Sequence, residues 1–125
     1  MEFEIFFGYP EIDKLMSDLN ARRKSGKLSK DEMKFHNKLG KAFTLLSQNP
    51  KHNSLETHEI KDLSKKFGKK VFQSYFENRT PAAGRFFWAY GPEKNNITVL
   101  AIESHPEDNK RGAYKRISLS NYPSG

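Results

Sequence analysis

Hydrophobic and aromatic residues concentrate in three runs in the second half of the chain. The runs cover residues 71–80, 85–92 and 97–105, and loops carrying Pro, Gly and Asn separate them. Runs of β-branched and aromatic residues bounded by turn residues are typical of antiparallel strands that follow one another in the chain. The pattern therefore predicts a three-stranded meander, around which the other elements are expected to be arranged.

The first half of the chain predicts a short strand followed by two amphipathic helices. Residues 3–7 have strand composition, and Pro10 suits the first turn of a helix that runs to residue 24. Ser29, with a glutamate three residues later, has the spacing of a capping box and begins a second helix that ends near Gln48. We expect both helices to pack against one face of the later sheet.

The remaining segments complete the predicted fold. Residues 54–60 suggest a short strand, and residues 61–70 suggest a polar, lysine-rich loop. After the meander, residues 106–112 suggest a loop and residues 114–120 a last edge strand. The expected fold class is α+β: one domain covering residues 1–125, with two N-terminal helices packed on a small, mainly antiparallel sheet of four to five strands.

The composition suits a single folded domain and excludes several classes of protein. A chain of 125 residues with 10 Phe, 5 Tyr and one Trp can build one core but not two. The absence of cysteine excludes a disulfide scaffold and a cysteine-ligated metal. No apolar run approaches the roughly 18 residues of a membrane span, and the N-terminal residues lack the pattern of a signal peptide. We therefore expect a cytoplasmic protein that does not associate with membranes.

The chain is strongly basic, with a net charge of +7 and a pI near 9.6. Such a surplus predicts a polyanion or an acidic protein as partner. The alternative is a surface that lysines merely keep soluble. Positive charge is concentrated at residues 22–24, 65–70 and 110–116, and the last two clusters flank the meander. The first cluster ends a predicted helix, where it complements the helix dipole.

Several motifs in their order along the chain resemble the RelE/ParE superfamily of bacterial toxin–antitoxin modules. They are Asn49-Pro50, the segment 55–60, the strand 85–90 that opens with arginine, and the strand 97–102 with a histidine shortly after it. The likeness covers about residues 41–108 and is greatest to the YafQ/YoeB/HigB-like ribonuclease branch. It implies an endoribonuclease that cleaves mRNA on the ribosome. It also implies an antitoxin partner, usually acidic in its binding segment, that silences the toxin.

The resemblance also assigns roles to individual residues. Arg85 matches the strand arginine that contacts the scissile phosphate, and His105 matches the strand-end histidine that acts as general acid or base. His58 lies near the position of a further histidine in the YafQ-like members. Tyr114 corresponds to a C-terminal aromatic residue that stacks on a base. The expected RNA-binding residues are Lys61, Lys65, Lys66, Lys69, Lys110, Arg111 and Tyr114.

These residue types suit RNA cleavage without a metal ion. The reaction needs a base for the 2′-hydroxyl, an acid for the leaving 5′-oxygen and positive charge on the phosphate. Histidine titrates near pH 6.5 and can fill either proton role, while arginine binds phosphate through two parallel hydrogen bonds. The histidines lack ligand spacing, and the scattered glycines form no phosphate-binding loop. We therefore expect no metal and no other cofactor.

Each assignment has a plainer alternative. Strand-end histidines are most often packing or surface residues, and Arg85 could pair with Glu77 or Glu103 instead of a phosphate. Phe86, Trp88 and Tyr90 share one face of their strand and are expected in the core rather than in base stacking. The functional alternative is a non-catalytic, toxin-like binding module that inhibits a target or pairs with an acidic antitoxin.

Overall fold

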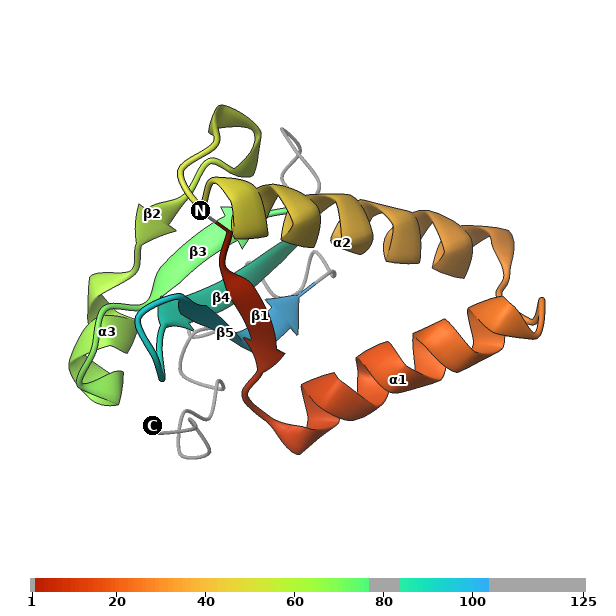
Figure 1. Ribbon diagram of the computed structural model, residues 1–125, viewed down its shortest axis with the longest axis horizontal. Coiled ribbons are helices and arrows are strands. Elements are labelled where there is room, and N and C mark those ends of the chain that lie inside the picture. Colours follow the sequence, from red (N-terminus) through yellow and green to blue (C-terminus); the bar gives the residue numbers. More distant parts are fainter. Residues whose placement is uncertain (1, 77–83, 104–125) are drawn as a thin grey trace.

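The structure is a computed structural model that describes residues 2–76 and 84–103 (Figure 1). It has an α+β fold in which α-helices pack on a five-stranded sheet, as the sequence predicts. The elements in order are β1 (Glu4–Phe7), α1 (Pro10–Lys24), α2 (Lys30–Gln48), the 3-10 turn η1 (Asn53–Leu55), β2 (His58–Glu59), α3 (Lys61–Phe67), β3 (Phe72–Tyr75), β4 (Arg85–Tyr90) and β5 (Asn96–Glu103).

The predicted antiparallel meander is confirmed and forms the centre of the sheet. The strand order is β1-β5-β4-β3-β2, and every neighbouring pair is antiparallel except β1 and β5. β1 lies parallel to β5, with Ile5 opposite Ile97. A register shift between Phe87 and Trp88 marks a bulge in the β4–β5 pairing. The edges are therefore formed by β1 and the two-residue β2, and the two longest strands, β4 and β5, lie inside the sheet.

Local sequence signals explain the ends of the first two helices. Pro10 occupies the first turn of α1, and acidic residues follow it near the positive end of the helix. At the start of α2 the capping box forms as predicted. The Glu32 N–H donates to Ser29 Oγ at 3.1 Å, and the Ser29 N–H donates to Glu32 Oε1 at 3.0 Å.

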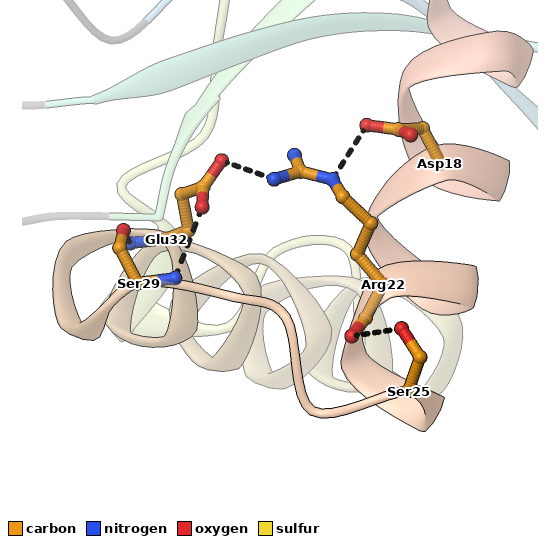
Figure 2. A network of polar contacts seen from close by, with 5 residues as sticks. All are labelled: Asp18, Arg22, Ser25, Ser29 and Glu32. Carbon is orange, nitrogen blue, oxygen red and sulfur yellow. Dashed lines mark hydrogen bonds and ion pairs between the residues drawn. The ribbon is translucent and has the colours of Figure 1, made fainter.

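Arg22 joins these two helices at their connected ends (Figure 2). Its guanidinium bonds Asp18 within α1 at 3.0 Å and Glu32 of α2 at 2.8 Å. The pKa of Glu32 lies below its usual value, because the Ser29 backbone N–H and then Arg22 stabilise the carboxylate. Arg23 also contacts α2, through His36 and Asn37. The basic cluster at residues 22–24 thus contributes to helix pairing.

Helix α2 covers one face of the sheet and forms the main core with it. Phe43 of α2 lies 5.1 Å from Phe86 between ring centroids, and Phe35 lies 5.5 Å from Phe76, both edge-to-face. Phe86 and Trp88 are fully buried, as expected for core residues. Tyr90 shares their face but keeps 37% of its surface exposed, so the core expectation fails for it.

The segment between α2 and β3 departs from the prediction. Residues 61–70 are not a loop, because α3 runs over most of them and ends at Gly68, whose φ of +84° is the left-handed conformation that glycine adopts readily. Leu63 is 1% exposed and attaches this helix to the core. The predicted strand at 54–60 shrinks to two residues, since Glu56 has φ +47° and interrupts extended backbone. The predicted loop and strand at 106–120 lie outside the described residues.

Within residues 2–76 and 84–103, no helix combines the length and the apolar character that crossing a membrane requires.

Candidate functional site

The face of the sheet opposite α2 carries two of the three predicted catalytic residues. Side chains alternate between faces along a strand, and Phe86 faces α2, so Arg85 lies on the other face. Tyr75 pairs with Arg85 across β3 and β4, and Gln73 shares the face of Tyr75 two positions away. His58 pairs with Gln73 across β2 and β3. His58 and Arg85 therefore project from the same face, two strands apart.

Three side chains on this face form a polar row, which we define as His58, Gln73 and Tyr75. The Gln73 amide donates to the Tyr75 hydroxyl at 2.9 Å and approaches His58 Nε2 at 3.5 Å. His58 Nδ1 lies 3.2 Å from the Glu56 carbonyl. These partners require an Nδ1–H tautomer, because a carbonyl oxygen can only accept. The lone pair on Nε2 is then directed at the Gln73 amide, which is only 2% exposed, so the exposed imidazole must give up this contact to act as a general base.

Arg85 is held by an ion pair and is largely buried. Its Nε donates to Glu103 Oε1 at 3.1 Å, and the two side chains are only 9% and 12% exposed. The guanidinium carbon also lies 6.0 Å from the centre of the Phe87 ring. The plainer alternative raised for Arg85, pairing with Glu103, is therefore present. A role on a phosphate stays a prediction, and it requires the guanidinium to exchange Glu103 for the phosphate.

The third predicted catalytic residue cannot be placed relative to the first two. His105 lies outside the described residues, and so do three of the predicted RNA-binding residues: Lys110, Arg111 and Tyr114. The assignments of His105 and Tyr114 stay predictions from the resemblance, and those of Lys110 and Arg111 stay predictions from the distribution of positive charge.

Most of the predicted RNA-binding lysines surround a shallow hollow beside α3, which we call the α3 hollow. It has a volume of about 510 Å³. Its lining residues are Glu59, Lys61, Ser64, Lys65, Gly68, Lys69 and Lys70. Lys66 is exposed on α3 but does not line the hollow. Four lysines against one carboxylate make this surface cationic, which suits a phosphate backbone.

Some residues of this region were not predicted from the sequence. Gln73 and Tyr75 are two positions apart in a predicted strand, which places them on one face, but nothing in the sequence indicates that the face carries His58. Lys70 was grouped with Lys69 in the basic cluster at residues 65–70 but was not named among the RNA-binding residues. The helix α3 was missed, although Leu63 and the terminal glycine are signals for it.

Within the described ranges, no group of three or more His, Cys, Asp or Glu side chains is arranged to hold a metal ion. The chemistry available there comes from an imidazole, a phenol, an amide and cationic side chains. Comparison of this chain with protein-family models, with curated proteins and with solved structures finds no match.

Proposed function

We propose that this chain is the toxin of a type II toxin–antitoxin module. In this proposal it is a metal-independent endoribonuclease that cleaves mRNA on the ribosome in the cytoplasm, and an antitoxin with an acidic binding segment neutralises it. One observation carries the proposal: the helices and sheet have a RelE-like arrangement, and the face opposite α2 carries the polar row together with Arg85.

The polar row supports a definite role for His58 in this reaction. Its Nε2 removes the proton of the 2′-hydroxyl, and the 2′-oxygen attacks phosphorus while the bond to the 5′-oxygen breaks. The proposed acid, His105, protonates that leaving oxygen. The products are a 2′,3′-cyclic phosphate and a 5′-hydroxyl end. Gln73 is a positioning residue, since it links the imidazole to Tyr75 rather than reacting itself.

The α3 hollow supports RNA as the substrate. Lys61 and Lys65 lie on α3, which follows the strand that carries His58, and Lys69 and Lys70 come directly after the helix. An RNA that crosses the polar row can therefore continue over a cationic surface. Contacts between lysine and phosphate are independent of base sequence, and salt weakens them.

The test is induced expression followed by mapping of mRNA ends. We expect growth arrest and new mRNA ends with the wild-type chain, and loss of those ends with His58→Gln and with His105→Gln. His52→Gln is the matched control, because it removes an imidazole outside the polar row. Circular dichroism of each purified variant establishes that it is folded. Absence of new mRNA ends with the wild-type chain would remove the nuclease proposal, and undiminished cleavage in both His58→Gln and His105→Gln would remove the catalytic roles of these histidines.

A second candidate function is a toxin-like binding module without catalysis. The observation that favours it is the burial of Arg85 in its ion pair with Glu103, because a phosphate-binding arginine is expected to face solvent. This candidate predicts growth arrest without new mRNA ends. Co-purification of the chain with the product of the adjacent reading frame tests the antitoxin partner that both candidates share.

A further inference from the structure

A second hollow lies where α2, η1 and the end of β3 meet. Its volume is about 200 Å³. Ala42, Leu45 and Leu55 contribute apolar surface to it. Lys38, Lys41 and the exposed Ser54 contribute polar groups. We call it the α2 hollow. It is separate from the α3 hollow, with which it shares no lining residue.

The polar groups of the α2 hollow favour an anion. Lys38 and Lys41 lie three residues apart on α2, so their side chains project from the same side of the helix. None of the described lining residues is acidic. Two ammonium groups and a hydroxyl around one hollow offer several donors to the oxygens of a phosphate.

The volume and the apolar surface of the α2 hollow restrict the class of ligand further. Pockets for drug-sized molecules run from about 300 to 1,000 Å³, so a hollow of about 200 Å³ takes a group no larger than a single nucleotide. An inorganic phosphate would leave the apolar surface without a partner. A nucleotide uses both parts, with its base against apolar side chains and its phosphate on the lysines. Proteins that bind single-stranded nucleic acids combine a cationic groove with aromatic side chains, and Tyr75 and Phe76 also line this hollow.

Tyr75 connects this hollow to the candidate site. The residue lines the α2 hollow, although its side chain belongs to the face opposite α2, where its hydroxyl accepts the hydrogen bond from Gln73 in the polar row. Because Tyr75 is the last residue of β3, a single strand of RNA can pass from the polar row to the hollow around this end of the strand. We propose that the α2 hollow is a second RNA-binding site, which holds a nucleotide flanking the one that lies on the polar row. This inference rests on the proposed function, because it takes RNA to be the substrate.

The experiment measures binding of a short, fluorescently labelled single-stranded RNA by anisotropy over a range of salt concentrations. Two variants probe the hollow: Lys41→Gln, which removes a cation, and Ser54→Glu, which adds an anion. Each has a matched control outside the hollow. Lys34→Gln removes the same charge from an exposed position of α2, and Asn53→Glu adds the same charge to the neighbouring position of η1.

We expect Lys41→Gln and Ser54→Glu to weaken binding several-fold while both controls stay close to wild type. The slope of log affinity against log salt should become shallower by about 0.7 for Lys41→Gln, the value for one phosphate contact to a single strand. Thermal unfolding of all four variants shows whether any loss reflects folding. If one of the two hollow variants is unfolded, the other still tests the hollow, because Lys41 lies on α2 and Ser54 lies in η1.

Equal losses of RNA affinity in the hollow variants and in their controls overturn the inference, because they indicate only a general effect of charge. Absence of RNA binding by the wild-type chain overturns it as well. In either case, mapping of mRNA ends with wild type and with His58→Gln tests the proposed function separately. New ends that depend on His58 leave that function standing without the second site, and absence of new ends removes both.

Discussion

Arg85 and Glu103 pair at the ends of β4 and β5, and this contact affects how any variant of Arg85 is interpreted. Both side chains are nearly enclosed, so removing one deprives the other, a largely buried charge, of this ion pair. Such changes cost about 3–5 kcal/mol, whereas replacing both partners with apolar residues is often close to neutral. Lost activity in Arg85→Ala therefore does not by itself demonstrate a catalytic role.

We predict a large coupling between these two residues. Arg85→Met and Glu103→Leu should each lower the free energy of unfolding by about 3–5 kcal/mol, and the double variant should lose much less than the sum. Urea denaturation of the four proteins measures the coupling. Additive losses would show that the pair contributes nothing beyond its separate side chains.

The same pair offers a test of the phosphate role. If Arg85 exchanges Glu103 for a phosphate, Glu103→Gln should tighten RNA binding, because a neutral amide competes less for the guanidinium. Unchanged binding in a folded Glu103→Gln protein would leave Arg85 with a structural role alone. The anisotropy assay described above measures this directly.

At the scale of elements, the contact between α1 and α2 depends on a neutral histidine. Arg23 Nη1 donates to His36 Nδ1 at 2.9 Å, so His36 Nε2 carries the proton and donates to Asn20 Oδ1 at 2.7 Å. Protonation would place an N–H against the Arg23 guanidinium. The pKa of His36 lies below its usual value, first because burial disfavours the charged ring and second because Arg23 repels it.

This geometry predicts that mild acid destabilises the protein. His36 binds a proton more readily when the chain is unfolded, so its contribution is fully present above the unfolded pKa of about 6.5. The contribution is lost as pH falls through the lower pKa of the folded state. We expect the urea midpoint to decrease from about pH 7.5 to pH 5 in wild type, and to decrease less in His36→Gln. Identical pH profiles for the two proteins would contradict the role of His36.

Glu32 must be separated from His36 in this measurement, because it lies on the same helix and bonds α1 through Arg22. Its pKa is also lowered, so its contribution is present above about pH 4.5 and is lost as pH falls through the folded value. Keeping the measurement above about pH 5 therefore isolates the histidine.

At the scale of the whole molecule, the net charge of +7 is useful only if it is concentrated where a ligand lies. The described residues place four lysines around the α3 hollow and two at the α2 hollow. Other lysines, such as Lys14 and Lys27, are exposed on or near α1. Location should therefore decide RNA affinity more than the total charge does.

A comparison of two charge-reversal variants tests this expectation. The double variant Lys61→Glu with Lys65→Glu should weaken RNA binding strongly and make the salt slope shallower by about 1.4, which corresponds to two phosphate contacts. Lys14→Glu with Lys27→Glu changes the net charge equally and should have a much smaller effect. Equal losses in both double variants would indicate that only the overall charge attracts RNA.

The sequence alone was sufficient for those elements that local interactions determine. Both long helices were predicted within a residue or two, because Pro10, the capping box at Ser29 and the recurring apolar positions are signals contained in a few neighbouring residues. The meander followed from strand-forming runs separated by turn residues. The α+β class and the packing of helices on a sheet were predicted from these elements.

Only the tertiary structure decided contacts between distant segments. Local signals could not reveal that β1 pairs in parallel with β5 or that Leu63 packs a helix onto the core. The pairing of Arg85 with Glu103 was named from the sequence only as one alternative, and the fold established it. Local signals also could not indicate that Tyr75 and Lys41 line the same hollow. Such contacts depend on how several elements fill one core together, because each local segment is compatible with more than one partner. The candidate residues were therefore named from the sequence, but their partners and exposure required the fold.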